Sequence, residues 1–143
     1  MTLKIGVIDG QGGGIGSAII KRLRAVRGES VEIIALGTNA IATAQMLKAK
    51  ANRGASGENA IVQTAPKLDV ILGPLAILLA NAMMGEVTPA MAEAVSSSPA
   101  HKLIIPLTQE NVTVVGVIGD PLPHLVEDLV GTHLTKITTT IQS

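Results

Sequence analysis

The chain has 143 residues, enough for one domain with a substantial core, and its 11 Lys and Arg residues balance 11 Asp and Glu residues. Hydrophobic residues make up 47% of the chain, yet Phe, Trp, Tyr and Cys are all absent. The neutral charge and the missing aromatic rings argue against nucleic-acid binding, and the missing Cys excludes disulfides, thiolate metal sites and Cys nucleophiles.

Apolar runs that are typical of strands alternate with helical patterns along the chain. We expect strands at residues 4–8, 31–36, 70–72 and 102–107, and a short β-like run at residues 60–64. We expect helices at residues 15–27, 40–51, 75–84, 89–96 and 120–134. The alternation predicts a parallel sheet with helices on both of its faces.

The predicted fold is a single Rossmann-like α/β domain over residues 1–136, a three-layer sandwich with a mostly parallel sheet. A tight turn at residues 108–111, followed by a strand-like run at 112–117, predicts an antiparallel hairpin at the sheet edge. The threonine-rich residues 137–143 are expected to form a flexible C-terminal tail.

A glycine-rich loop follows the first predicted strand. It consists of Asp9, Gly10, Gln11, Gly12, Gly13, Gly14, Ile15 and Gly16. A strand, a glycine loop and a helix in this order present backbone N–H groups and a helix N-terminus to a phosphate. The alternative is a tight turn that only needs several residues with positive φ.

The spacing Gly10-x-x-x-Gly14-Ile15-Gly16 resembles the cofactor loop of short-chain dehydrogenases/reductases. The resemblance covers about the first 40 residues and implies NAD(P) or another nucleotide as ligand. It gives Gly10 the tight turn, Gly14 the close approach of a pyrophosphate, and Gly16 the packing of the helix. The catalytic Tyr of that family has no counterpart in a chain without Tyr, so catalytic residues stay unknown and enzyme activity stays open.

Polar residues at other predicted strand ends complete the candidate site. The second predicted strand is followed by Thr38 and Asn39, with no acidic residue for a ribose. Arg53 can clamp a phosphate or carboxylate, and Glu58 beside Asn59 can act as a base or metal ligand. The alternative is a solvated loop with a weak surface ion pair.

Asp9 and the histidines allow limited chemistry. Asp9 can bind a cation or a ribose hydroxyl, or its carboxylate can cap the glycine loop. The histidines at positions 101, 124 and 133 form no metal-binding motif, so we predict no metal site from them. The serines lack a nucleophile-elbow motif, which excludes a hydrolase of the triad kind.

The segment from Leu75 to Met84 is apolar nearly all round and is predicted to be a helix. Such a helix must be buried, which points to a homodimer or other homo-oligomer through this helix; the alternative is a central helix of the monomer. No stretch is long and apolar enough to cross a bilayer, and the N-terminus lacks a signal-peptide pattern. We therefore expect a cytoplasmic protein without membrane contact.

Four stretches of the chain resemble a family of short bacterial proteins known only as a domain of unknown function. They are residues 7–16 (VIDGQGGGIG), 35–40 (ALGTNA), 51–60 (ANRGASGENA) and 121–124 (PLPH). This resemblance implies a Rossmann-like sheet and brings no activity. Two functional hypotheses follow: binding of a nucleotide or other small phosphorylated ligand at the Asp9 to Gly16 loop, or a non-enzymatic oligomeric interaction module whose glycine loop is only a turn.

Overall fold

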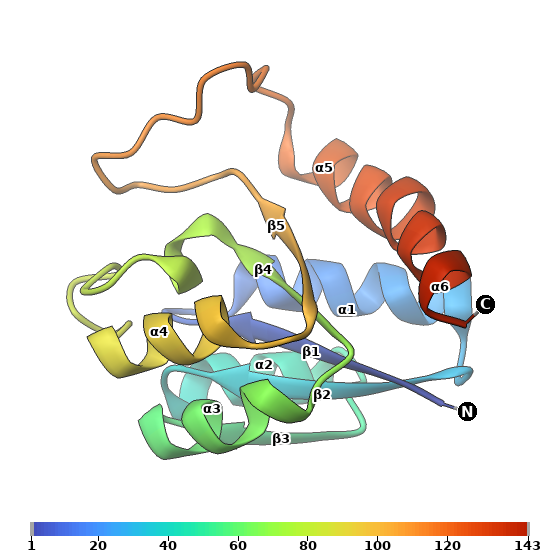
Figure 1. The fold of residues 1–143 in the computed structure, drawn as a ribbon, viewed down its shortest axis with the longest axis horizontal. Coiled ribbons are helices and arrows are strands. Elements are labelled where there is room, and N and C mark those ends of the chain that lie inside the picture. The colour runs from blue at the N-terminus through green and yellow to red at the C-terminus, as the bar shows by residue number, and fades with distance from the viewer. Residues whose placement is uncertain (1, 143) are drawn as a thin grey trace.

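Buried apolar runs build the central sheet of the protein. The computed structural model describes residues 2–142. The strands are β1 (Leu3–Asp9), β2 (Val31–Gly37), β3 (Arg53–Ser56), β4 (Val70–Pro74) and β5 (His101–Ile105). They lie in the order β3-β2-β1-β4-β5, and every neighbouring pair is parallel (Figure 1). Because β1, β2 and β4 are buried on both faces, their sequences are nearly continuous in apolar residues.

Helices cover both faces of the sheet. They are α1 (Gly14–Arg27), α2 (Ala40–Lys48), α3 (Glu58–Thr64), η1 (Ala65–Lys67), η2 (Leu75–Leu78), α4 (Pro89–Ser97), α5 (Leu122–Asp128), η3 (Leu129–His133) and α6 (Leu134–Gln142). One core cluster lies between the sheet and α1, α2 and the α5–α6 segment, and a second lies under α3 and α4 (Figure 1). The fold is therefore a three-layer Rossmann-like α/β sandwich.

Local capping explains where several helices begin and end. The side chain of Asn39 accepts a hydrogen bond of 2.8 Å from the Ala42 N–H at the start of α2. The hydroxyl of Thr88 does the same for Met91 in α4, where Pro89 occupies the first helical position.

The sheet is all parallel, so the predicted antiparallel edge hairpin is wrong. After β5 the chain leaves the sheet, and residues 106–121 form an irregular loop (Figure 1). The run at 112–117 has strand-like residues but no strand partner in the described chain, and Val115 is 93% exposed. High β propensity without a partner strand does not make a strand.

Two other predicted elements differ from the structure. Residues 60–64 belong to helix α3, and the strand is the preceding segment, Arg53–Ser56. The predicted helix at 75–84 is only the short turn η2, because Asn81, Met83 and Met84 adopt positive φ and close tight turns instead. Ile77, Ala82 and Met83 are buried in the core of this chain, and the predicted helix does not exist; an oligomer through this segment stays a prediction.

The C-terminal segment that we expect to be a tail continues as helix. Residues 137–142 lie in α6, and Ser143 lies outside the described residues. The hydroxyls of Thr135 and Thr139 donate to carbonyls one turn earlier, and Leu134 is fully buried against the core. The threonines thus satisfy their hydroxyls on the helix itself. The domain boundary at residue 136 stays a prediction.

Candidate functional site

The main cavity lies at the carboxyl ends of β1, β4 and β5. It has a volume of about 470 Å³. Its walls are Asp9, Gly10, Gln11, Gly12, Gly13, Gly14 and Ile15 of the glycine loop, Pro74, Ala76 and Met83 after β4, Leu107, Thr108, Gln109 and Glu110 after β5, and Leu122 of α5. In the strand order β3-β2-β1-β4-β5, the chain places β2 and β3 on one side of β1 and then β4 and β5 on its other side, so the order of addition reverses between β1 and β4. This switch point is where open α/β sheets bind their ligands.

Asp9 forms the buried base of the glycine loop. It ends β1 and is only 3% exposed. Its Oδ1 accepts a hydrogen bond of 2.8 Å from the Gly10 N–H, and its Oδ2 accepts one of 2.7 Å from the Gly16 N–H. The carboxylate therefore holds the first turn of α1 to the end of β1, which is the capping role that the sequence allows for Asp9.

Burial and hydrogen bonding have opposite effects on Asp9. Burial is the largest influence and raises the pKa of its carboxyl above the ordinary value; the charge of Glu86 acts in the same direction. The N–H groups of Gly16, Gly10 and Ile15 lower the pKa, but the balance is a raised pKa. The buried carboxyl is thus easier to protonate than an exposed aspartate.

Glu86 clamps the glycine loop to the end of β2. Its Oε1 accepts hydrogen bonds from the Gln11 N–H at 2.8 Å, the Thr38 hydroxyl at 2.7 Å and the Asn39 amide at 2.8 Å. Partial burial acts to raise the pKa of Glu86, but these three donors outweigh it and the pKa is lowered. Glu86 therefore places an ionised carboxylate at the carboxyl end of β2, where the residues that follow the strand include no acid.

Packing explains why three of the loop residues are glycine. A Cβ on Gly10 would collide with Thr38 and Met83, and a Cβ on Gly16 would lie 2.5 Å from the sulfur of Met46. Gly13 has a φ of 72°, and its Cβ would lie 2.8 Å from the Ala42 carbonyl oxygen. None of these three positions accepts a larger residue without movement of its neighbours.

Gly12 and Gly14 are different from these three glycines. A Cβ on either one would meet nothing within 4 Å, and neither has a positive φ. Within the described residues, neither N–H group donates a hydrogen bond. Both residues line the cavity. The folded chain therefore gives no reason for glycine at these two positions, whereas a group that approaches the backbone closely would.

The remaining walls of the cavity are apolar, acidic or polar without charge. Ala76, Met83 and Leu107 supply apolar surface. The carboxylate of Glu110 accepts a hydrogen bond of 2.6 Å from the Met83 N–H, which links the loop after β5 to the segment after β4. None of the described residues that line this cavity is basic. A ligand here meets backbone dipoles and apolar atoms, and no positively charged side chain.

The structure brings together part of the predicted site. Residues 9–15 line the cavity. Gly16 does not line it, but its N–H donates a hydrogen bond to the Asp9 carboxylate. Thr38 and Asn39 lie behind the loop, with their side chains bonded to Glu86.

Three predicted residues lie elsewhere. Arg53 begins β3 and pairs with Glu32, away from the carboxyl edge. Glu58 and Asn59 are exposed in the first turn of α3 and do not line the cavity. The polar loop that was predicted to contribute them is a strand and a helix start, so its side chains follow those elements.

Several residues of the site and its support were missed by the sequence interpretation. Glu86 lies 75 positions from Gln11, between the predicted helices at 75–84 and 89–96. Residues 107–110 were assigned to a strand and a hairpin turn. The local sequence signal was Gly85, whose φ is positive in the structure. A glycine indicates a turn, but it does not indicate that an acidic residue reaches the site.

The fold and the cavity at the switch point define a Rossmann-like α/β protein with one candidate small-molecule site at the carboxyl edge of its sheet. The family model described as "Domain of unknown function (DUF3842)" matches residues 4–138, and the chain belongs to this family. The resemblance of the sequence to a domain of unknown function is thereby confirmed.

The other comparisons add little. No curated protein matches the sequence. Among solved structures, the chain is similar to a universal stress protein in complex with cAMP, with 21% sequence identity and a TM-score of 0.43 over 73% of this chain and 98% of the other. Within residues 2–142, no helix has the length and apolarity that a membrane span requires.

Proposed function

We propose that the protein binds a nucleotide or another small phosphorylated metabolite in the cavity at the carboxyl edge, with its phosphate on the N–H groups of Gly12 and Gly14. The observation that carries this proposal is that both residues line the cavity and neither needs to be glycine for the fold. The N-terminus of α1, a helix of 14 residues, adds its positive dipole end at the same place.

The clamp at Glu86 limits how a ligand can lie. An extended dinucleotide on this fold spreads over both sides of the glycine loop. Here Met83 and Glu86 fill the side that faces β2, next to Gly10. The ligand is confined to the side that faces Leu107 and Glu110. A cavity of about 470 Å³ on this side suits a mononucleotide or a sugar phosphate better than NAD(P).

The charges of the walls favour a ligand with few negative charges. Asp9 and Glu110 are the acidic residues of the cavity, and no described wall residue is basic. Each further phosphate group would add repulsion without a cation to offset it. The raised pKa of Asp9 reduces this repulsion only in part. We therefore expect a phosphate monoester to bind more tightly than the corresponding di- or triphosphate.

A dye-based thermal-unfolding screen tests the proposal. The panel contains nucleoside mono-, di- and triphosphates, NAD(P)(H), sugar phosphates and inorganic phosphate, each with and without Mg²⁺. A ligand at about 100 times its Kd adds roughly 2.7 kcal/mol of stability, which is easily detected in a domain of this size. Gly14→Asp should abolish the response, because it places a carboxylate in the open space above the cavity and does not collide with the fold.

A matched control adds a side chain elsewhere. Gly131 lies in η3 and also has no atom within 4 Å of an added Cβ, so Gly131→Ala should leave the ligand response unchanged. A response that survives Gly14→Asp would show that the loop is not the site. No response to any ligand would favour the oligomeric interaction module instead. A homo-oligomer and a cytoplasmic location remain predictions, and light scattering after size-exclusion chromatography tests the former.

A further inference from the structure

A second cavity lies on the α3 face of the sheet, near the amino ends of β1 and β3. Its volume is about 290 Å³. It is lined by Lys4 of β1, Ile34 and Leu36 of β2, Arg53, Gly54 and Ala55 of β3, Thr64 of α3, and Lys67 and Leu68 beside η1. None of these residues lines the cavity at the carboxyl edge. The two cavities are therefore separate sites.

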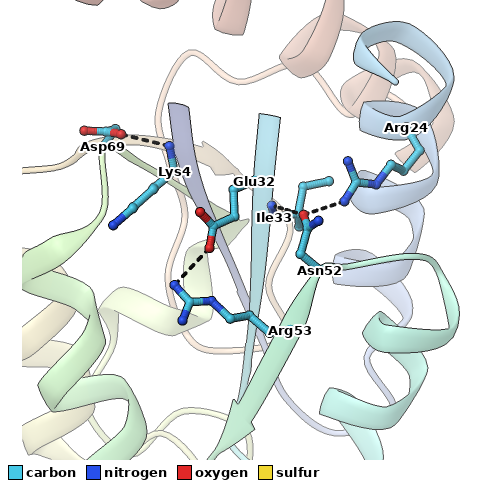
Figure 2. Close-up of polar contacts among 7 residues, drawn as sticks. All are labelled: Lys4, Arg24, Glu32, Ile33, Asn52, Arg53 and Asp69. Carbon is cyan, nitrogen blue, oxygen red and sulfur yellow. Dashed lines mark hydrogen bonds and ion pairs between the residues drawn. The ribbon is translucent and has the colours of Figure 1, made fainter. Parts of the chain in front are cut away.

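The three basic side chains of this cavity come together from distant parts of the chain. The parallel register places Lys4 opposite Glu32, and Arg53 begins the neighbouring edge strand. Figure 2 shows the Lys4 and Arg53 side chains on either side of the Glu32 carboxylate. Lys67 ends η1 on the wall that faces them. The arrangement concentrates positive charge around one opening.

Only part of this positive charge is neutralised. An Arg53 nitrogen lies 2.9 Å from a Glu32 oxygen, and this is the sole ion pair that the cavity's basic side chains form within the described residues. The Asp69 carboxylate accepts a hydrogen bond of 2.8 Å from the backbone N–H of Lys4 (Figure 2). Among the described residues, the ammonium groups of Lys4 and Lys67 have no ion-pair partner.

The inner walls of the cavity are apolar. Ile34, Leu36 and Leu68 are at most 6% exposed, and Ala55 continues this surface on β3. An apolar interior with a cationic rim suits a small ligand that has an aliphatic body and one anionic end. Arg53 can hold such an end through two parallel N–H bonds, because its guanidinium matches the geometry of a carboxylate or phosphate.

We propose that this cavity binds a small oxyanion on an aliphatic body, held by Arg53 with Lys4 and Lys67 around it. The oxyanion is a phosphate monoester or a carboxylate, and Glu32 is the internal competitor that occupies Arg53 in its absence. This inference is independent of the ligand at the glycine loop, because the two cavities share no residue.

The experiment follows backbone and arginine side-chain resonances by NMR during titration with butyl phosphate, butyrate and inorganic phosphate. We expect saturable shifts at Gly54, Ala55 and Thr64 with butyl phosphate or butyrate, and a Kd near or below about 1 mM. Weaker binding of inorganic phosphate would reflect the missing aliphatic body. The probe that binds more tightly identifies the source as a phosphate or as a carboxylate.

Two substitutions are expected to act in opposite directions. Arg53→Gln should weaken binding about 10- to 100-fold, because it removes the charge-assisted hydrogen bonds. Glu32→Gln should tighten it about 2- to 5-fold, because it releases Arg53 from a partly exposed ion pair. Lys67→Ala should weaken binding less than Arg53→Gln does. Lys21→Ala, an exposed change on α1, is the matched control and should change nothing.

The outcomes separate this inference from the proposed function. Shifts at Gly12 and Gly14 alone would overturn the second site and support the first. Shifts that do not saturate, or that persist unchanged in Arg53→Gln, would also overturn it. A single site at Gly54 and Ala55, with the expected opposite effects of the two variants, would support the second cavity whatever the glycine loop binds.

Discussion

The cavity at the glycine loop and the basic cavity beside β3, for each of which we propose an anionic ligand, present different chemical groups to that ligand. The first offers backbone N–H groups and a helix N-terminus, and its charged wall residues are Asp9 and Glu110. The second offers Lys4, Arg53 and Lys67 on an apolar interior. The carboxylates of Asp9 and Glu86 already accept hydrogen bonds from the glycine loop, whereas at the basic cavity Glu32 pairs with Arg53.

This difference has a consequence for mutation. The Asp9 carboxylate at the glycine loop is buried and bonded to the Gly10 and Gly16 N–H groups, so a change of Asp9 alters the fold together with any binding. The basic side chains are exposed, and Arg53 itself is 64% exposed at its side chain. A change at the second cavity should therefore alter binding and leave stability nearly constant. Measurements of unfolding free energy can test this difference.

The largest expected effect is that of Asp9→Ala. It leaves the N–H groups of Gly10 and Gly16 without their acceptor in a buried place. We expect the free energy of unfolding to fall by about 3 kcal/mol. This figure already allows for the desolvation of the carboxylate in the wild type, which opposes its stabilising effect. Urea unfolding followed by circular dichroism measures it, since the chain has no Trp. Arg53→Gln should change the same quantity by less than about 0.5 kcal/mol. Equal effects would refute the contrast.

A smaller effect separates two glycines of the same loop. Gly13→Ala forces a positive φ on a residue with a Cβ and brings that atom to 2.8 Å from the Ala42 oxygen, so we expect a loss of about 2 kcal/mol. Gly14→Ala meets nothing and restricts the unfolded chain, so stability should stay constant or rise by up to about 1 kcal/mol. Thermal unfolding without ligand compares the two. A similar loss in both variants would mean that Gly14 is required by the fold, and would remove the main support for the proposed function.

The sequence predicts the parts of this fold that depend on local patterns. The continuous apolar runs of β1, β2 and β4 indicate a buried parallel sheet, and the glycine loop before α1 indicates a candidate ligand loop at the carboxyl end of β1. The short strand β3 has no such pattern, since all four of its residues are exposed, and it exists because β2 offers it a partner. The run at residues 60–64 is too short to distinguish helix from strand by periodicity.

The candidate site was predicted only where it is local in sequence. Residues 9–15 could be recognised because one loop contains them all. Glu86 could not, because it reaches Gln11 only through a turn built on the left-handed residues Asn81, Met83 and Met84. Methionine rarely adopts positive φ, so no sequence pattern predicts the turn at Met83 and Met84. Arg53 was predicted to reach the cavity at the carboxyl edge, but it lies elsewhere because β3 directs its side chain toward Glu32.

The smallest expected effect concerns the clamp itself. Glu86→Gln keeps an acceptor for Gln11, Thr38 and Asn39 but removes the charge. Because the pKa of Glu86 is lowered in the folded protein, its contribution to stability is present above the unfolded value of 4.5 and is lost as the pH falls through the lower folded value. We expect the wild type to exceed the variant by about 0.5–1 kcal/mol at neutral pH, a figure already reduced for screening by solvent. Urea unfolding at a series of pH values should show this advantage disappear below pH 4.5, with the exposed change Glu29→Gln as the measure of losing one surface charge. An advantage that is constant down to low pH would mean that the clamp depends on shape and not on the ionised carboxylate.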